Sequence, residues 1–432
     1  MSPADLPTIV ATAGGSAVSI EITLVLLLLI AAAVSVVTRL IRLPYTVTLV
    51  LAGLVVAVSG LSSPLDLSAD LIFYVFLPVI LFEAALTTPG TYLRASWKPI
   101  AILAVPGVLL AFGLTAGGLR LLTGESWSTV LLFGALIAAT DPVSVVALFR
   151  RLKIDRHLTT IVDGESLFND GTAAVVFAIV LSGVTAHATL GPGGAVVRFL
   201  WMAGGGLILG WAVGTLASRA HHLLDERMLE LMLTMITAYG SFLAAQLLGM
   251  SGPVACVVAG IVVGNTGRRI GMSEGVASAV NLFWEFAAFL VNSLVFLLIG
   301  LRTNLGAIAD HLGLVVIAFF VVLVARAVTV YATGAASHLV APRLPLRWQH
   351  VLVWGGLRGS VALALALSIP ASVVHRDLIV TTAFGVVLIS LVLQGLTMRP
   401  LVRALGLSPR RPRPTNVPHP DTSGDAPPTG LP

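Results

Sequence analysis

The chain has 432 residues, of which 57% are hydrophobic and only 10% are charged. Globular proteins carry about 25% charged residues, so this composition excludes a soluble globular protein and indicates a polytopic membrane protein. The formal net charge of +5 does not indicate a nucleic-acid partner, because the basic residues fall in short clusters between apolar segments and set membrane topology. The single cysteine, Cys256, excludes a disulfide framework and a cysteine metal site.

Apolar segments long enough to cross a bilayer recur along the chain and predict thirteen membrane-spanning helices. The expected spans are residues 20–38, 44–60, 70–86, 98–121, 127–150, 157–184, 195–217, 228–248, 252–265, 277–301, 311–338, 348–370 and 378–400. We therefore expect an all-α membrane domain over residues 20–405, a short external segment over 1–19, and a disordered cytoplasmic tail rich in proline and arginine over 406–432.

The basic residues test this arrangement of spans. With thirteen spans, 19 of the 25 lysines and arginines fall on one side of the membrane. Cytoplasmic loops carry such an excess, so the pattern predicts a multi-pass protein of the cytoplasmic membrane with its N-terminus outside and its C-terminus inside. Membrane lipid is an expected partner, and the arginines of the tail are expected to contact anionic lipid.

The fifth span contains Thr140-Asp141-Pro142 near its middle. Proline lacks an N–H and clashes with the carbonyl group four residues earlier, so the helix should open there and free backbone oxygens. Secondary transporters coordinate cations at such broken helices near the membrane midplane. A simple proline kink, with Asp141 capping the following half-helix, is the alternative interpretation.

The sixth span contains the sequence GESLFNDG at residues 164–171. At about 1.5 Å per residue, Asp170 lies roughly 20 Å along this helix, close to the bilayer centre. The four-residue spacing places Glu165 one turn from Asn169, and it places Ser166 one turn from Asp170. A carboxylate at this depth costs about 2.5–3.5 kcal/mol, so we expect Asp170 to belong to an ion or proton pathway.

The twelfth span contains Gly355-Gly356-Leu357-Arg358-Gly359, whose three glycines permit close packing or local unwinding. The twelfth span lies seven spans after the fifth, so the two cross the membrane in opposite directions. Interrupted helices at matching places in the two halves predict an inverted repeat, with the seventh span as connector and the two broken helices crossing.

Two further charged residues fall near mid-depth, Glu83 in the third span and Arg326 in the eleventh. The buried set then has four acids and two bases, so pairing cannot neutralise it unless some acids are protonated or bind a cation. The members of this set are Glu83, Asp141, Glu165, Asp170, Arg326 and Arg358. The imbalance predicts cation transport, with Glu83 as a candidate pathway residue.

Three other polar residues receive no part in ion binding from the sequence. Asp163 lies near the cytoplasmic end of the sixth span and is expected to be a solvated first-turn acid. Glu285 stays unassigned near a membrane interface, and Asn292 is expected to form hydrogen bonds between helices.

Together these segments resemble the monovalent cation/proton antiporter family, and within it the NhaP-like sodium/proton exchangers that carry an Asn-Asp pair. The matching segments occur in family order at residues 77–83, 139–143, 164–171, 324–327 and 355–359. The resemblance covers residues 20–400 and implies a homodimer in which a six-helix core moves against a dimerisation domain. No long regulatory tail, and hence no accessory protein bound to one, is expected.

The resemblance also implies roles for single residues. It places the transported Na⁺ or H⁺ at Asp170, with Asp141, Thr140 and Ser166 nearby. Around this site it implies a structural network, which consists of Glu165, Asn169, Arg326 and Arg358. The Asn-Asp pair implies electroneutral exchange of one Na⁺ for one H⁺, and no cofactor is expected.

The leading prediction is therefore a secondary antiporter, not an enzyme, that works by alternating access with Asp170 holding either a proton or a cation. K⁺/H⁺ exchange stays open, because selectivity depends on sub-ångström geometry. An intramembrane aspartyl protease using Asp141 and Asp170 is the alternative from another class, but it leaves Glu165 and the buried arginines without a role. A channel would need rings of carbonyls or charges, and no filter-like repeat is visible.

Overall fold

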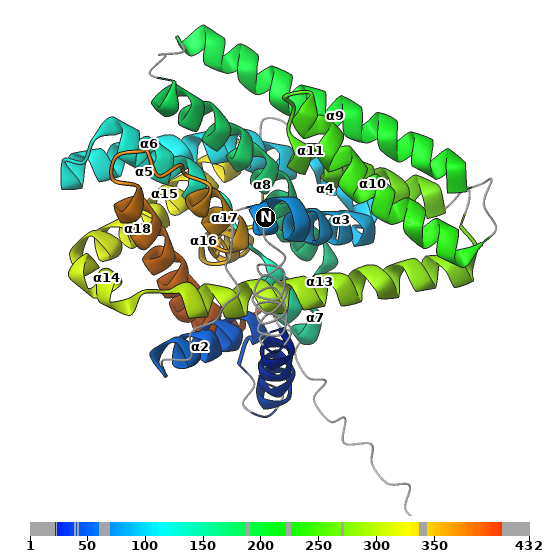
Figure 1. The fold of residues 1–432 in the computed structure, drawn as a ribbon, viewed down its shortest axis with the longest axis horizontal. Coiled ribbons are helices and arrows are strands. Elements are labelled where there is room, and N and C mark those ends of the chain that lie inside the picture. The colour runs from blue at the N-terminus through cyan, green and yellow to red at the C-terminus, as the bar shows by residue number, and fades with distance from the viewer. Residues whose placement is uncertain are drawn as a thin grey trace, which may run out of the picture.

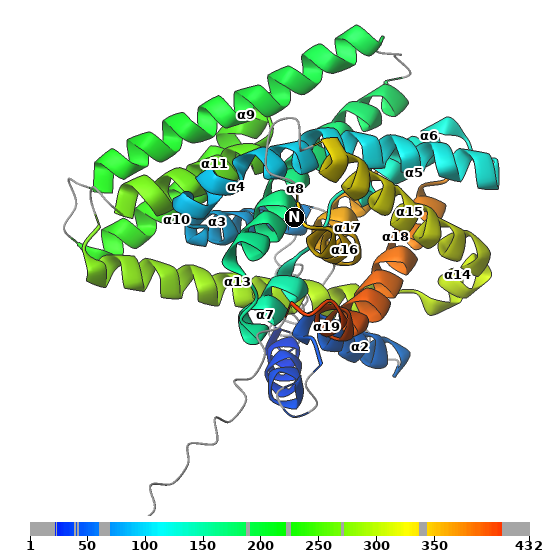
Figure 2. The same ribbon diagram turned by 180° about the vertical axis from the view of Figure 1, so that it is seen from behind.

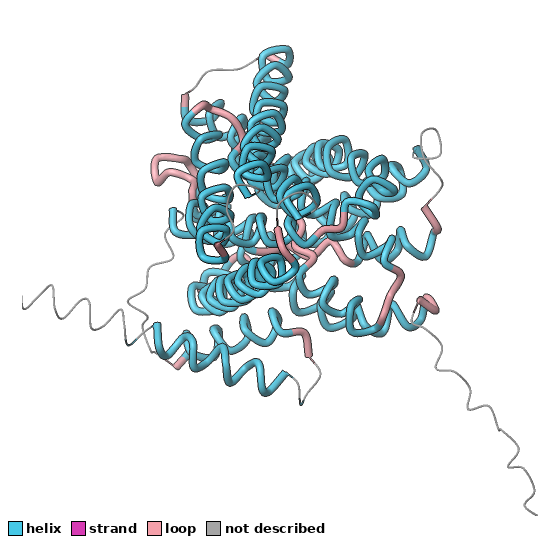
Figure 3. The backbone as a smooth tube through the Cα atoms, turned by 90° about the vertical axis from the view of Figure 1, so that its right-hand side faces the viewer, coloured by secondary structure: helices cyan, strands magenta, loops and turns pink. Residues whose placement is uncertain are grey.

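The computed structural model describes residues 24–38, 43–59, 70–186, 191–221, 226–268, 272–336 and 344–407, together with residues 22 and 40. Within these ranges the chain is helical and contains no strand (Figure 3), which confirms the predicted all-α class. The predicted external segment and residues 408–432 of the predicted tail lie outside the described residues.

Seven of the described helices are long and apolar enough to cross a membrane. They span residues Gly90–Thr123, Arg156–Thr185, Gly193–His221, Arg227–Leu247, Glu274–Arg302, Leu312–Ala335 and Arg376–Ala404. Shorter apolar helices span Leu24–Thr38, Tyr45–Val58, Leu71–Thr87, Trp127–Ile137 and Gly252–Gly267. Each overlaps one predicted span, and the fifth and twelfth predicted spans are each divided between two short helices. The number of membrane crossings stays a prediction.

The described helices pack as two units, which we call the panel unit and the core unit. The panel unit consists of α2 (Tyr45–Val58), η1 (Leu71–Phe76), α3 (Leu77–Thr87), α9 (Pro192–His221), α10 (Arg227–Leu247), α11 (Gly252–Val262), η3 (Val263–Gly267) and α13 (Glu274–Arg302). The core unit consists of α4 (Gly90–Ile102), η2 (Leu103–Gly107), α5 (Val108–Thr123), α6 (Trp127–Ile137), α7 (Val143–Leu152), α8 (Arg156–Thr185), α15 (Leu312–Ala336), α16 (Leu346–Trp354), α17 (Ser360–Leu367), α18 (Arg376–Ile389), η5 (Ser390–Gln394) and α19 (Gly395–Ala404). The short α14 (Leu305–Asp310) lies between α13 and α15 in the chain. Figures 1 and 2 show α9, α10 and α11 on one side of the molecule and α5, α6, α15 and α18 on the other.

Within the panel unit, α2 and α13 cross at two glycines. A Cβ atom on Gly53 would lie 2.1 Å from a main-chain oxygen of α13, and one on Gly300 would lie 2.1 Å from a main-chain oxygen of α2. The backbones are therefore in direct contact, and no side chain fits at either position. The ring of Tyr45 in α2 also stacks on Phe289 in α13, with 5.4 Å between ring centroids. These contacts hold α2 and α13 together as one body.

Helix α8 lies at the boundary of the core unit, where it also contacts α9 and α11 of the panel unit (Figure 1). It begins after Asp155, whose carboxylate accepts the backbone N–H of His157 at 2.7 Å and caps the helix. Two glycines allow neighbours to approach closely. A Cβ on Gly164 would lie 2.7 Å from a side chain of α4, and one on Gly171 would lie 2.6 Å from a side chain of α11. The core unit and the panel unit therefore both pack tightly on α8.

The fifth and twelfth predicted spans are interrupted in their middles. The first gap separates α6 from α7 and contains Pro142, which has no N–H to continue a helix. The second separates α16 from α17 and ends at Gly359, which has extended backbone geometry. The gaps contact each other, because the backbone N–H of Asp141 donates to the carbonyl of Leu357 at 2.7 Å. The predicted crossing of two broken helices is confirmed.

Candidate functional site

The polar face of α8 lies against the gap between α6 and α7. Glu165, Ser166 and Asn169 are buried, and Asn169 has no exposed surface. The Asn169 amide donates to Thr140 Oγ1 at 2.6 Å and to Glu165 Oε1 at 3.1 Å, and its oxygen accepts the Thr140 backbone N–H at 3.4 Å. The Ser166 hydroxyl donates to the Thr140 carbonyl. These bonds fix the gap against α8 at the depth of Asp170.

Glu165 pairs with Arg326 of α15. Two guanidinium nitrogens of Arg326 donate to the two carboxylate oxygens of Glu165, each at 2.8 Å, and both side chains are buried. Arg326 also donates to the Leu352 carbonyl in α16 at 3.0 and 3.2 Å. Gly356 leaves room for the Arg326 side chain, because a Cβ atom at position 356 would lie 2.8 Å from Arg326 Nε. The bidentate pair cancels the charge of Glu165, so Glu165 does not compete for a cation.

Arg358 lies in the gap between α16 and α17, and its side chain reaches the gap between α6 and α7. One of its guanidinium nitrogens donates to the carbonyls of Ala138 and Ala139, both at 3.0 Å. The two carbonyls belong to the C-terminal end of α6, where the helix dipole favours a positive charge. The sequence led us to expect free backbone oxygens for a cation at this gap, and that expectation is wrong for these two, because Arg358 occupies them.

The two mid-depth aspartates have different surroundings. Asp141 accepts the backbone N–H of Val143 at 3.0 Å, which caps α7, and its carboxylate lies against Gly359. A Cβ on Gly359 would lie 2.1 Å from Asp141 Oδ2. In contrast, the buried Oδ1 atom of Asp170 has no hydrogen-bond partner in the described part of the chain. A buried carboxylate oxygen that no protein group donates to takes its partner from outside the protein: a proton, a cation or a water molecule.

A cavity of about 430 Å³ connects these groups. It lies between α3 and α13 of the panel unit and, in the core unit, the gap after α6 together with α7, α8 and α17. Of the residues predicted to act on the ion, it is lined by Glu83, Thr140, Asp141, Ser166 and Asp170. Glu165, Asn169, Arg326 and Arg358 do not line it and lie behind its wall. The structure therefore separates the residues that can touch an ion from those that support them.

The cavity is also lined by polar and charged residues that had no predicted role in the site, among them Arg150, Asp163, Glu285 and Asn292. Asp163 is half-buried on the cavity wall, which differs from the solvated end of a helix that we expected. For all of these except Arg150, a spacing of seven residues was the available signal. Asp163 precedes Asp170 by two helical turns, and Glu285 precedes Asn292 by two turns, so each pair shares a helix face.

Three features are those of ion-coupled secondary transporters with broken helices: the crossed interruptions, the Glu165–Arg326 pair, and the Asp170 Oδ1 atom that has no hydrogen-bond partner in the described chain. The transmembrane family described as "Sodium/hydrogen exchanger" matches residues 24–404 of this chain. The chain belongs to this family.

Similar proteins of known name support the assignment. The Na⁺/H⁺ antiporter ApNhaP of Aphanothece halophytica is 40% identical over 368 residues, which is 85% of this chain and 70% of that protein. The Na⁺/H⁺ antiporter NhaP of Pseudomonas aeruginosa is 37% identical over 397 residues, which is 85% of this chain and 92% of that protein. The solved structure of the sodium proton antiporter MjNhaP1 from Methanocaldococcus jannaschii has the same fold, with a TM-score of 0.74 at 20% identity, over 91% of this chain and 99% of that one.

Proposed function

We propose that this protein is a secondary antiporter that exchanges Na⁺ for H⁺, with Asp170 as the group that holds either ion. The observation that carries the proposal is the charge balance at the crossing. Glu165 is matched by Arg326, Arg358 is matched by carbonyl oxygens, and Asp141 accepts an N–H at the start of α7. Asp170 alone among these groups has a buried oxygen with no partner in the described chain.

The chemistry follows from competition at one carboxylate. A proton on Asp170 removes the charge that attracts Na⁺, and Na⁺ on Asp170 displaces the proton. Asp141, together with the hydroxyl oxygens of Thr140 and Ser166, supplies further oxygen ligands around the same cavity. Hard monovalent cations take such oxygen ligands. The Ser166 hydroxyl donates its hydrogen to the Thr140 carbonyl, and Thr140 Oγ1 accepts one N–H from Asn169, so each hydroxyl oxygen keeps a lone pair for a cation. One site that holds one ion at a time then produces exchange.

The two packing units supply the conformational change. The cavity lies at their boundary, so a movement of the core unit against the panel unit would open Asp170 first to one side and then to the other. Arg150, which lines the cavity, and its neighbour Arg151 support a cytoplasmic location for that end of the cavity by the positive-inside rule. We propose a location in the plasma membrane with the N-terminus outside, and a homodimer formed through the panel unit.

Exchange of one Na⁺ for one H⁺ moves no net charge. The support for this stoichiometry is Asn169, a neutral amide in the position next to Asp170, which donates to Thr140 and Glu165 and cannot carry a second proton. Potassium is the alternative cation, because the ligand set alone does not exclude the larger ion. The protease alternative receives no support, since one carboxylate oxygen of Asp141 is engaged in capping α7.

The test is transport in proteoliposomes that contain the purified protein and a fluorescent pH indicator. An outward Na⁺ gradient should drive protons inward and acidify the lumen, and the rate should saturate with Na⁺. Parallel vesicles with K⁺ in place of Na⁺ identify the cation. Absence of proton movement with both ions, in vesicles where the protein is folded, would refute the proposal.

A further inference from the structure

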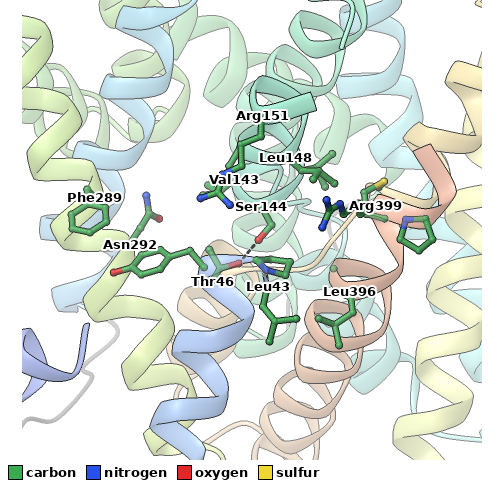
Figure 4. A pocket seen from close by; sticks show the side chains of 17 residues that line it. Leu43, Thr46, Val143, Ser144, Leu148, Arg151, Phe289, Asn292, Leu396 and Arg399 are labelled. Atoms are coloured by element: carbon green, nitrogen blue, oxygen red, sulfur yellow. Dashed lines mark hydrogen bonds between the residues drawn. The ribbon is translucent and has the colours of Figure 1, made fainter. Parts of the chain in front are cut away.

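A second cavity, of about 550 Å³, lies between α2 and α13 of the panel unit and α7 and α19 of the core unit (Figure 4). Its size falls in the range of about 300–1,000 Å³ that is usual for small-molecule sites. Leu43, Leu148 and Leu396 contribute to a mainly apolar wall, and no lining residue is acidic. Asp141 and Asp170 do not line this cavity, although it adjoins the first cavity, with which it shares Val143, Ala147, Phe289 and Asn292 as wall residues.

Two arginines line this cavity, Arg151 from α7 and Arg399 from α19. Figure 4 shows both side chains extending from the core helices towards the cavity. Within the described chain, neither guanidinium group has an ion pair or a hydrogen bond. Two unpaired positive charges at an apolar cavity complement a molecule that has an anionic end and an apolar body.

The source of such a molecule follows from the surroundings of the cavity. Arg151 and Arg399 belong to the basic side of the protein, where the inner leaflet supplies anionic lipids. The chain's own C-terminal segment is a poor occupant, because it carries Arg410, Arg411 and Arg413 and would be repelled by the two arginines. A phospholipid offers both a phosphate and an acyl chain, whereas free phosphate would leave the apolar wall unused.

We propose that this cavity binds one anionic phospholipid, with its phosphate between Arg151 and Arg399 and one acyl chain along the leucine wall. The lipid would lie across the boundary of the two units, at the place where the hydroxyls of Thr46 in α2 and Ser144 in α7 form a hydrogen bond (Figure 4). The binding proposal does not depend on the transported ion, so it is tested by binding alone.

The experiment uses the purified full-length protein in detergent, stripped of lipid and titrated with dioleoyl phosphatidylglycerol or dioleoyl phosphatidylcholine. Native mass spectrometry measures the affinity of the tightest-bound lipid. We expect saturable binding of one phosphatidylglycerol, at least tenfold tighter than phosphatidylcholine. The double variant Arg151→Gln/Arg399→Gln should lose at least tenfold of this affinity.

The matched control removes two arginines of the same side that are exposed and outside the cavity, Arg94→Gln with Arg347→Gln, and should bind the lipid as the unchanged protein does. Leu396→Trp fills the apolar part and keeps both arginines, so it should also weaken binding, and it keeps the test valid if the arginine variant does not fold. Unchanged binding in either cavity variant would overturn the proposal. Equal affinity for glycerol 1-phosphate would overturn it as well, since that result indicates a site for the phosphate alone.

Discussion

Removal of Arg326 should reveal how the buried charge beside the ion site is stabilised. In Arg326→Ala, Glu165 stays buried and loses both of its guanidinium hydrogen bonds, each of 2.8 Å. Its remaining contact is the Asn169 amide at 3.1 Å, which carries no charge. Breaking one partner of a buried pair costs about 3–5 kcal/mol, because the other charge is left uncompensated.

The double variant Arg326→Ala/Glu165→Leu separates this charge effect from the other contacts of Arg326. It removes both charges, while the Leu352 carbonyl still loses its two donors, which costs about 1–3 kcal/mol. Asn169 keeps its bond to Thr140 Oγ1 at 2.6 Å in both variants. We therefore expect the double variant to be more stable than the single variant by roughly 2 kcal/mol, although it contains one more substitution.

The assay is thermal unfolding in one detergent, with the fraction of protein that remains monodisperse measured after heating. The expected order of midpoints places the unchanged protein first, the double variant second and Arg326→Ala last. Arg347→Ala removes an exposed arginine and should match the unchanged protein. If the double variant unfolds at or below the temperature of Arg326→Ala, the charge of Glu165 is not what Arg326 compensates, and the reasoning fails.

Three other predictions concern transport in proteoliposomes. Asp170→Asn should abolish Na⁺-driven proton movement without lowering thermal stability, because it removes the titratable charge and keeps the shape; any remaining exchange would contradict its role. Gly359→Ala should impair exchange and lower stability by about 1–3 kcal/mol, since its Cβ would lie 2.1 Å from Asp141 Oδ2, and normal transport would mean that Asp141 can move freely. An imposed membrane potential should leave the exchange rate unchanged, whereas a transport current would indicate a second proton carrier.

Hydropathy and local motifs were sufficient to predict much of this fold. Apolar length located the helices, because a bilayer demands a similar number of apolar residues from every span. Pro142 and the glycines of residues 355–359 marked the two interruptions, since these residue types prevent or relax a regular helix. The four-residue spacing in α8 correctly placed Asn169 beside Glu165, and these residues are in contact.

These local patterns could not predict contacts between segments that are distant in the sequence. Nothing local to Arg358 shows that its guanidinium reaches the carbonyls of Ala138 and Ala139, because that contact depends on how two gaps cross. The same holds for the cavity wall, to which Asp163 and Glu285 both contribute from helices of different units. A seven-residue spacing shows that two residues share a helix face, but the face that lines a cavity is decided by packing.

The bond between the Asp141 N–H and the Leu357 carbonyl has a mechanical consequence. Together with the bonds from Arg358, it fastens the midpoint of one broken helix to the midpoint of the other. Each broken helix has one half on either side of this joint. The two broken helices therefore cannot separate at their midpoints unless these bonds break. While the joint is intact, the backbone of Asp141 keeps its position beside Leu357 when either half-helix tilts.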